Sequence, residues 1–291
     1  MRSGFVSLIG RPNVGKSTLL NRYVGEKVAA VSPKPQTTRN RITGVRNGDG
    51  FQIVFIDTPG FHKPVSKMHR RMVSLARSAL EGIDLILLIV DAAAEFGPGD
   101  RFVLEELKRT ATPALLALNK IDLIAKGRLL PLIDRYRREH DFQAVVPISA
   151  LHGDGLEELE GELAAALPEA EPVFSQEVLS DQPERSLAAE IIREKVFLFT
   201  RQEIPYCSAV LIDLLDEHER GIDVAATILV ERATQKGIVI GKGGRMLKKI
   251  GTAARTELEG ILNTRVQMQL WVKVKDDWRE DDRVLREIGL G

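Results

Sequence analysis

Residues 10–17 read GRPNVGKS, and this stretch decides the fold of the first part of the chain. It fits the pattern G-x-x-x-x-G-K-[ST], follows an apolar run at residues 5–9 and precedes a helical pattern at residues 18–23. In this context glycines let the backbone wrap around phosphates, while the helix N-terminus and Lys16 supply positive charge and Ser17 supplies a ligand for Mg²⁺. A Gly-rich turn without a ligand is the alternative, but a chance match to the whole pattern is about one in a hundred for this length. The stretch therefore predicts a phosphate-binding loop.

Short apolar runs alternate with helical patterns on both sides of this loop. Beyond the first run, they lie at residues 53–56, 85–90, 115–118 and 145–148. Nearly continuous Val, Ile and Leu indicate strands buried on both faces, and the alternation with helices indicates right-handed βαβ crossovers. Residues 42–46 and 51–56 flank the turn sequence NGDG at 47–50, which predicts one antiparallel hairpin. Residues 1–167 are thus predicted to form an α/β domain with a mixed, mostly parallel six-stranded sheet.

The pattern changes after residue 167. Residues 168–183 contain prolines and acids without a clear period, which predicts a linker. Residues 184–291 are predicted to form a smaller α+β domain with the element order α-β-β-α-α-β. Its expected elements are helices at 186–199 and 246–262, a short helix ending near residue 240, strands at 209–215, 224–230 and 266–274, and a terminal helix at 279–288.

Composition narrows the class of protein. The chain has 291 residues, of which 44% are apolar, and its 41 basic and 41 acidic residues give zero net charge, so a disordered chain is excluded. The apolar runs fall far short of the roughly 20 residues of a membrane-spanning helix, and the N-terminus has no secretory pattern. Cys207 is the single cysteine, which excludes an intrachain disulfide and a Cys-based zinc site and favours a cytoplasmic location.

A second motif follows the strand pattern at residues 53–56. Its members are Asp57, Thr58, Pro59 and Gly60. A carboxylate at this place can hold Mg²⁺ through water, and the Gly60 N–H can reach a γ-phosphate. D-x-x-G is common in turns, but its position behind the phosphate-binding loop, at the end of a buried strand, favours the functional interpretation.

A third motif follows the strand pattern at residues 115–118. Its members are Asn119, Lys120, Ile121 and Asp122. Asp122 can accept two hydrogen bonds from guanine that adenine cannot donate, and such discrimination is strong because the wrong base leaves buried polar groups unpaired. Ser149 and Ala150, after the next strand, could place the Ala150 N–H on the guanine O6. Alone, N-K-x-D also suits a helix N-cap, but behind the other two motifs it indicates guanine.

These motifs, in this order, resemble those of the P-loop GTPases. More narrowly, residues 35–41 (PQTTRNR) and 57–64 (DTPGFHKP) resemble the Era family, bacterial GTPases of small-ribosomal-subunit assembly. The resemblance implies a first switch at residues 32–41 and a second at residues 57–67, both ordered by the γ-phosphate and released on hydrolysis. It also implies that GTP or GDP is bound by Gly10, Arg11, Pro12, Asn13, Val14, Gly15, Lys16, Ser17, Thr18, Asp57, Thr58, Pro59, Gly60, Phe61, Asn119, Lys120, Ile121, Asp122, Ser149 and Ala150.

The resemblance also implies residue roles in catalysis. Lys16 is expected to stabilise transition-state charge, and a switch threonine to close on Mg²⁺ when GTP is bound. We favour Thr38 over Thr37, because Thr38 directly precedes Arg39 in the motif. The expected metal ligands are then Ser17, Thr38 and Asp57.

Two further positions bear on the rate of hydrolysis. Phe61 stands where many GTPases have a glutamine that orients the attacking water, so slow intrinsic hydrolysis is expected. Asn13 is a candidate ligand for a K⁺ ion beside the phosphates, as in relatives of this family, and the alternative is an asparagine that caps the loop.

Residues 239–251 (VIGKGGRMLKKIG) resemble the G-x-x-G corner of a KH domain, and the element order matches the prokaryotic variant of that fold. Residues 232–256 carry seven basic side chains and no acidic one, which favours binding of a nucleic-acid backbone over a plain helix cap. The residues expected to bind RNA are Ile240, Gly241, Lys242, Gly243, Gly244, Arg245, Lys248 and Lys249.

Taken with the resemblance, these features predict a monomeric GTPase that binds single-stranded RNA. The expected RNA is the 3′ end of 16S rRNA, the expected partner is the 30S ribosomal subunit, and the expected role is subunit assembly and rRNA maturation under control of the nucleotide. Peripheral association with the cell membrane is left open. Two alternatives compete: a GTPase that docks mainly to a protein or membrane partner, and an RNA chaperone with a structural nucleotide site.

Overall fold

The computed structural model describes residues 1–32, 34 and 37–290, and the chain divides into two compact units. The first unit comprises Met1–Ala29, Thr38–Pro64 and Met72–Asp181, and the second comprises Ala30–Thr37, Val65–Arg71 and Gln182–Gly291. Residues 33, 35 and 36, which belong to the expected first switch, and residue 291 lie outside the described residues.

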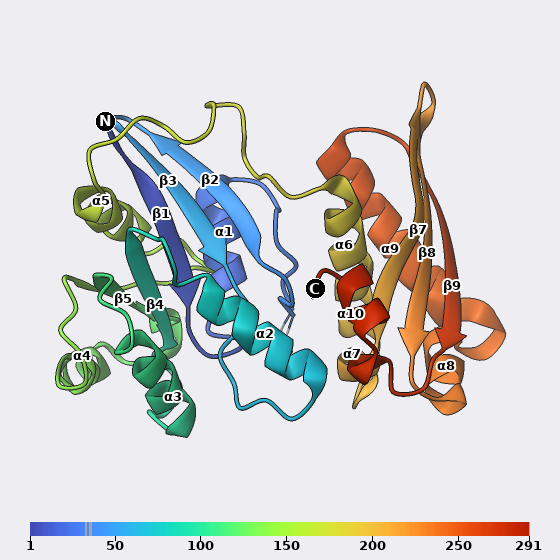
Figure 1. Ribbon diagram of the computed structural model, residues 1–291, viewed down its shortest axis with the longest axis horizontal. Coiled ribbons are helices and arrows are strands. Elements are labelled where there is room, and N and C mark those ends of the chain that lie inside the picture. Colours follow the sequence, from blue (N-terminus) through green and yellow to red (C-terminus); the bar gives the residue numbers. More distant parts are fainter. Residues whose placement is uncertain (33, 35–36, 291) are drawn as a thin grey trace. The chain divides into compact units, whose positions relative to one another are not determined.

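A six-stranded sheet forms the centre of the first unit (Figure 1). Its strands are β1 (Arg2–Ile9), β2 (Ile42–Gly48), β3 (Phe51–Asp57), β4 (Leu85–Asp91), β5 (Ala114–Asn119) and β6 (Val145–Pro147). The spatial order is β2-β3-β1-β4-β5-β6, and every neighbouring pair is parallel except β2 and β3. The predicted mixed, mostly parallel sheet is confirmed. The hairpin turn is tighter than expected, because β2 extends to Gly48 and only two residues separate it from β3.

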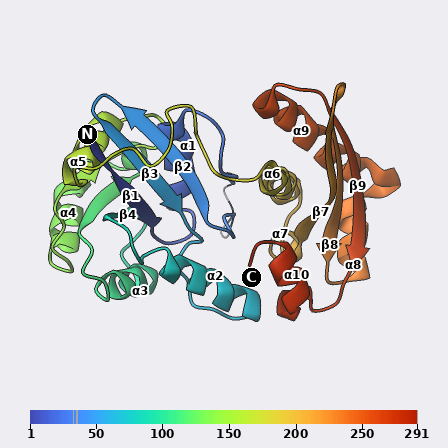
Figure 2. The ribbon, with the colours of Figure 1, turned by 45° about the horizontal axis from the view of Figure 1, so that its top comes forward.

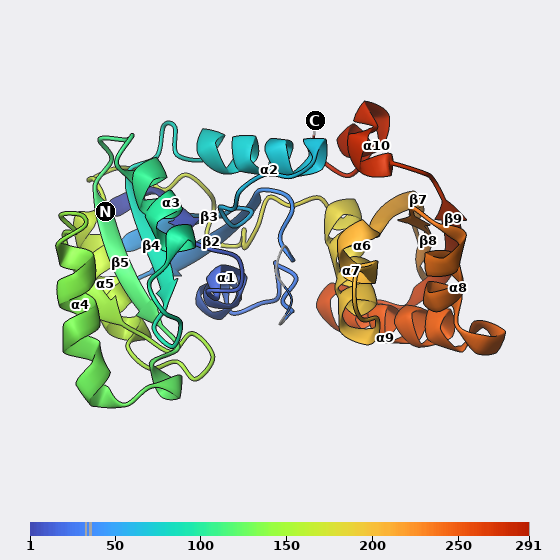
Figure 3. The same cartoon turned by 90° about the horizontal axis from the view of Figure 1, so that it is seen from below.

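Helices cover both faces of this sheet. Side chains of α1 (Lys16–Val24) and α5 (Leu156–Ala166) pack in one apolar cluster with one face. Side chains of α2 (Lys67–Ser78), α3 (Pro98–Leu107) and α4 (Leu129–Arg137) pack in another cluster with the opposite face. Figure 3 shows α1 and α2 on opposite sides of the strands. The continuous apolar run of β4 is explained by this double cover, since its first six residues are all buried.

The parallel strands bring the three motifs to one edge of the sheet. The phosphate-binding loop follows β1, the D-x-x-G motif follows β3, and the N-K-x-D motif follows β5. The carboxyl ends of parallel strands are where open α/β sheets bind their ligands. This topology places motifs that are up to about 100 residues apart in sequence within reach of one ligand.

The segment predicted to be a linker follows the edge of the same sheet. Val45 N donates to the Leu179 carbonyl over 2.8 Å, and Ser180 Oγ donates to the Thr43 carbonyl over 2.7 Å. Gln52 accepts hydrogen bonds from the backbone of residues 173 and 174. The first unit ends at Asp181 by its contacts, and the predicted domain bounds themselves stay a prediction.

In the second unit, helices pack on one face of a three-stranded sheet (Figure 2). Its elements are α6 (Glu184–Phe199), α7 (Ile204–Cys207), β7 (Ala209–His218), β8 (Gly221–Val230), α8 (Ala233–Ile240), α9 (Arg245–Leu262), β9 (Val266–Val274) and α10 (Asp282–Glu287). β8 pairs antiparallel with β7 and parallel with β9. The predicted order α-β-β-α-α-β is confirmed for the main elements.

Three details of the second unit differ from the expectation. The β7–β8 hairpin is longer than predicted, because its polar ends remain paired up to a two-residue turn. The short helix α7 was not expected. The terminal helix begins only at Asp282, after a single 3₁₀ turn at Trp278–Glu280, because the Asp281 side chain accepts hydrogen bonds from the first backbone N–H groups of α10.

Candidate functional site

The phosphate-binding loop connects β1 to α1 through Gly15, where the backbone strongly favours glycine. Gly15 has φ 104°, in the left-handed region, and a Cβ there would lie 2.2 Å from Asn119 Nδ2. The loop and the N-K-x-D motif therefore touch at this point. Pro12 and Thr18 are half-buried along the same loop and helix, and Asn13 is exposed with φ 65°.

Lys16 lies buried at the start of α1. Its Nζ donates to the Arg11 carbonyl over 3.3 Å. Burial lowers the pKa of the Lys16 ammonium, and the attraction of the Asp57 carboxylate opposes this effect. A desolvated cation at a helix N-terminus gains most from a negatively charged ligand, so this geometry suits a phosphate group.

The three expected metal ligands come together beside Lys16. Ser17 Oγ lies 2.6 Å from Asp57 Oδ2 and 2.7 Å from Thr38 Oγ1, and Thr38 Oγ1 lies 3.4 Å from the same carboxylate oxygen. Asp57 Oδ1 is buried and has no hydrogen-bond partner within the described residues. Burial raises the pKa of Asp57, while Lys16 and the hydroxyl donors oppose the rise. Oxygen donors around an unpartnered carboxylate oxygen fit a hard cation such as Mg²⁺.

The two candidate switch threonines face different partners. The hydroxyl of Thr38 points to Ser17 and Asp57, whereas that of Thr37 donates to the Lys34 carbonyl over 2.8 Å and lies 2.7 Å from Ser32 Oγ. The geometry supports Thr38 as the threonine that could hold a metal.

The D-x-x-G motif is buried behind the phosphate-binding loop. Thr58 Oγ1 donates to the Leu8 carbonyl over 3.2 Å, and Pro59 and Gly60 are buried. Phe61 N donates to the Gly10 carbonyl over 3.1 Å, which ties this motif to the loop. The Phe61 ring is 1% exposed and packs edge to face against Phe102, so it belongs to the core.

Asn119 connects three parts of the site. Its Nδ2 donates to the Val14 carbonyl over 2.7 Å, and its Oδ1 accepts from the backbone N–H groups of Lys120 and Ala150 at 2.8 and 2.9 Å. Lys120 extends elsewhere and pairs with Asp91 at the end of β4 over 2.6 Å. Asn119 therefore acts as a strut between the phosphate-binding loop and the loops that follow β5 and β6.

Asp122 lies in the 3₁₀ turn Ile121–Leu123 that follows β5. Its Oδ1 accepts a hydrogen bond from Ser149 Oγ over 2.6 Å, and its side chain stays 19% exposed. The backbone of Ile121 is fixed by a 3.2 Å bond from its N–H to the Ile148 carbonyl. The Ala150 N–H, expected to meet the guanine O6, donates to Asn119 in this structure.

Sequence reasoning missed a network behind the phosphate-binding loop. Arg11 pairs with Asp100 of α3 over 2.8 Å, and Asp100 also accepts from the Gly97 N–H and from Tyr136. Asp100 is 5% exposed, so its charge depends on these partners. The sequence does signal the helix cap, because an acid stands at the third position of a helix that starts with proline. It carries no signal for the ion pair between Asp100 and Arg11.

In the second unit, the G-x-x-G corner joins α8 to α9. Gly241, Gly243 and Gly244 have φ values of 72°, 60° and 76°, so the chain turns sharply in the left-handed region. A Cβ on Gly241 would lie 2.7 Å from Met246 Cβ, whereas a Cβ on Gly243 would meet open space. The corner therefore leaves its backbone open at Gly243.

Four cations surround this corner and are at least partly exposed. They are Lys242, Arg245, Lys248 and Lys249. Lys249 Nζ lies 4.2 Å from the centre of the Phe199 ring, which fixes its direction. Ile240 is half-buried and packs against the core of the unit. The arrangement gives an open backbone beside concentrated positive charge, which suits the sugar-phosphate chain of a nucleic acid.

These features define a P-loop GTPase joined to a KH domain. Residues 5–120 match the family described as 50S ribosome-binding GTPase, and residues 203–279 match the KH domain family. Among the described residues, no helix is long and apolar enough to cross a membrane.

The particular family follows from full-length relatives. The chain is 52% identical over 290 residues to the GTPase Era of Geobacter metallireducens, covering 99% of this chain and 97% of the relative, and 51% identical to that of Syntrophus aciditrophicus, covering 99% and 95%. The chain belongs to the Era family of GTPases.

Two solved structures share the whole architecture. A tyrosine-to-alanine variant of Aquifex aeolicus Era bound to GDP and AlF₄⁻ superimposes with a TM-score of 0.96 at 41% identity, with 100% of both chains covered. An Era in complex with MgGDPNP and nucleotides 1506–1542 of 16S ribosomal RNA gives 0.96 at 42% identity, covering 100% of this chain and 99% of the other.

Proposed function

We propose that this chain binds GTP with Mg²⁺ at the carboxyl edge of its six-stranded sheet, hydrolyses it slowly, and uses the nucleotide state to control RNA binding by its KH domain. The observation that carries the catalytic part is the meeting of Ser17, Thr38 and Asp57 beside the buried Lys16. The membership of the Era family supports the GTPase activity.

Ser17, Thr38 and Asp57 are the residues that would hold Mg²⁺. Two hydroxyls and a carboxylate suit this hard cation, and the unpartnered Asp57 Oδ1 offers an acceptor for the ion or for a water that the ion orders. When bound, the ion neutralises charge on the β- and γ-phosphate oxygens.

Hydrolysis follows from the protein groups around the γ-phosphate. Water attacks the γ-phosphorus in line with the bond to the β–γ bridging oxygen. That bond breaks, GDP leaves with the electron pair, and the water proton passes to phosphate and solvent. Lys16 and the loop N–H groups stabilise the charge in the transition state. Because Phe61 is packed in the core and has no polar side-chain atom, it cannot orient the water, so the intrinsic rate is slow.

Asn13 is the residue through which K⁺ could act. It is exposed in the phosphate-binding loop, and its backbone has a φ of 65°. We propose that K⁺ accelerates hydrolysis through Asn13. Equal hydrolysis rates in KCl and NaCl would exclude this role, and Asn13→Ala should abolish any difference between the two salts.

The RNA partner is proposed from the KH corner and from a relative. The cations of the corner offer phosphate contacts, and the solved Era bound to nucleotides 1506–1542 of 16S rRNA shows the kind of RNA that a family member binds. We propose that this chain binds the 3′ end of 16S rRNA as a monomer in the cytoplasm and acts in 30S subunit assembly and rRNA maturation.

The test is RNA affinity measured with a GTP analogue, with GDP and without nucleotide, using the 16S rRNA 3′ tail and a shuffled control. Binding should be tight and sequence-selective in the GTP state, because coupling between the two sites is reciprocal. Equal affinity in all nucleotide states would exclude the switch. Unselective RNA binding in every nucleotide state would favour the alternative that the chain docks mainly to a protein partner.

A matched pair of variants tests the corner itself. Gly243→Asp puts a negative charge where there is room for a side chain, and Gly243→Ser puts a neutral one at the same backbone strain. The aspartate should weaken RNA binding much more than the serine, with GTP hydrolysis unchanged in both. Replacing Lys242 or Lys248 by alanine should each reduce the slope of log affinity against log salt by about 0.7.

A further inference from the structure

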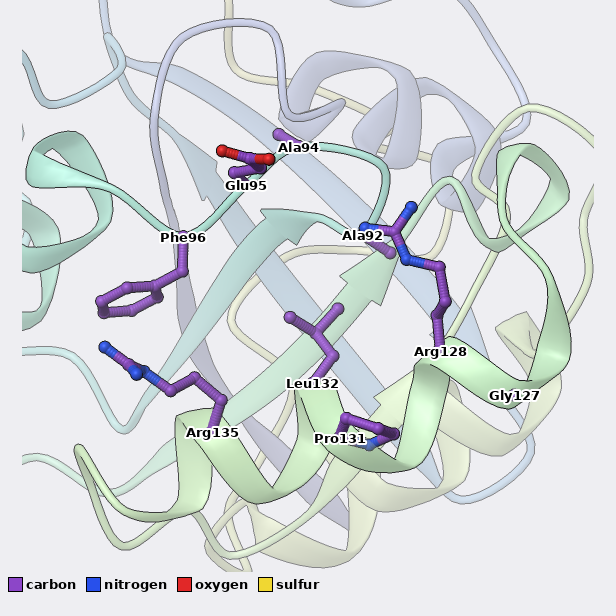
Figure 4. A pocket seen from close by; sticks show the side chains of 9 residues that line it. All are labelled: Ala92, Ala94, Glu95, Phe96, Gly127, Arg128, Pro131, Leu132 and Arg135. Atoms are coloured by element: carbon purple, nitrogen blue, oxygen red, sulfur yellow. The ribbon is translucent and has the colours of Figure 1, made fainter.

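A hollow in the first unit shares no residue with the nucleotide site. It lies between the loop that follows β4 and the beginning of α4, with a volume of about 360 Å³ (Figure 4). This volume is within the range of protein ligand pockets, which starts at about 300 Å³. Its walls are formed by Ala92, Ala94, Glu95, Phe96, Gly127, Arg128, Pro131, Leu132 and Arg135.

The floor of the hollow is apolar. Figure 4 shows Leu132 projecting into its middle, with Pro131 on the same helix and the ring of Phe96 on the facing loop. The first turn of α4 also exposes 72% of Leu130. Such a floor gains from an apolar side chain that displaces water, as the central anchors of protein interfaces do.

The rim of the hollow is basic on two sides. In Figure 4 Arg128 stands on one side of Leu132 and Arg135 on the other. Arg135 stacks over Phe96 at 4.4 Å, lies 3.7 Å from Glu139 and remains 45% exposed. Arg128 is exposed and forms no ion pair within the described part of the chain. Residues 126–138 carry five basic side chains and one acidic side chain. Glu95 is the acidic group of the walls, and it lies across the hollow from α4.

We propose that this hollow docks an acidic segment of a partner protein, with an apolar side chain on Leu132 and carboxylates at Arg128 and Arg135. Complementary charge selects and orients such a segment, and the apolar anchor supplies the buried area. Bidentate pairing suits carboxylates, which match the planar fork of a guanidinium. A nucleic-acid backbone uses exposed cations but gains little from an apolar floor, so the apolar floor favours a peptide as the occupant.

The experiment uses the full chain with GDP bound. A displayed library of ten-residue peptides is drawn from Asp, Glu, Leu, Phe, Trp and Gly, and enriched peptides are measured by fluorescence anisotropy at low salt. We expect enriched peptides to combine two or more acids with a Leu, Phe or Trp. Their affinity should fall about tenfold in Arg128→Glu and further in Arg128→Glu/Arg135→Glu.

A double variant on the same helix controls for general electrostatics. Arg137→Glu/Arg138→Glu makes the same change in net charge with residues that do not line the hollow, and it should keep binding within about threefold. Because Arg128 has no carboxylate partner to lose among the described residues, its variant should fold normally and bind GDP as the unmodified chain does.

Three results would overturn the proposal. The first is a library without enriched acidic peptides, and the second is peptide binding that all three variants weaken equally. The third is a single-stranded RNA octamer that displaces the peptide and depends on Arg128 and Arg135 in the same way, which would assign the hollow to nucleic acid.

Discussion

Replacing Asn119 by alanine should destabilise the first unit even without nucleotide. The side chain is 2% exposed, and it makes three hydrogen bonds to the backbone of three separate loops. Alanine removes all three and adds none. The contribution of Asn119 is therefore to hold the site together, beyond any contact with a base.

The magnitude follows from which partners remain buried. The bonds to the Val14 carbonyl and the Ala150 N–H are buried, whereas the bond to the Lys120 N–H is only partly so. A buried polar group left without a partner costs about 1–3 kcal/mol, so two such groups predict a loss of about 4 kcal/mol in the free energy of unfolding. A loss of this size is a large share of the stability of an ordinary domain.

The chain offers an internal control for the assay. Its two tryptophans, Trp271 and Trp278, both lie in the second unit, so tryptophan fluorescence during urea unfolding reports that unit. Circular dichroism reports the unfolding of both units, so its comparison with the fluorescence reveals the transition of the first unit. Asn119→Ala should lower the midpoint of the first unit and leave the tryptophan transition unchanged.

Asp122→Ala is the matched variant at the same motif. It removes one hydrogen bond, from Ser149 Oγ, and should cost about 1 kcal/mol while abolishing selectivity for guanine. If Asn119→Ala were as stable as Asp122→Ala, the strut role of Asn119 would be wrong. A shift of both unfolding transitions together would refute that role as well.

Three more predictions concern other residues. Phe61→Gln should not accelerate GTP hydrolysis, because the Phe61 ring is buried against Phe102. A glutamine at this buried position should lower the free energy of unfolding by about 3 kcal/mol. A faster single-turnover rate of hydrolysis would refute the placement of residue 61 in the core. Burial raises the pKa of the Cys207 thiol to about 11. The folded chain then keeps a proton that the unfolded chain loses above about pH 9, so the stability of the second unit should fall between pH 9 and 11. Urea titrations at stepped pH should show this fall, and it should be less steep in Cys207→Ala. Asp100→Asn should weaken the pair with Arg11 and lower the affinity for GTP by about 1 kcal/mol, measured by calorimetry against Asp134→Asn on α4; equal affinities in both variants would remove Asp100 from the site.

Much of the fold could be predicted because pattern and topology agree. The apolar run of β4 indicates a strand covered on both faces, and the parallel order then brings loops after β1, β3 and β5 to one edge. The exact points where helices begin were harder to predict. Helix α10 begins at Asp282 because the Asp281 side chain caps it, and the sequence is also compatible with one continuous helix through this segment.

The residues of the candidate site also fall into a part that could be predicted and a part that could not. Residues with a fixed spacing, such as Lys16 and Ser17, carry a signal in the chain itself. Partnerships between distant residues carry none, and so neither the pairing of Arg11 with Asp100 nor the reach of Asn119 to Val14 could be predicted. These contacts exist because tertiary packing brings separate loops together, and the periodicity of the sequence does not indicate which loops will meet.

The linker along β2 has a consequence for any attempt to divide the chain. β2 is an edge strand, and its outer backbone groups bond to residues 179 and 180, while Gln52 of β3 holds residues 173 and 174. A chain cut after residue 167 would keep every nucleotide motif and lose this cover. Its bare strand edge would then be a template for pairing with a second molecule, so such a fragment should self-associate and aggregate. A fragment that continues to Asp181 should stay dispersed.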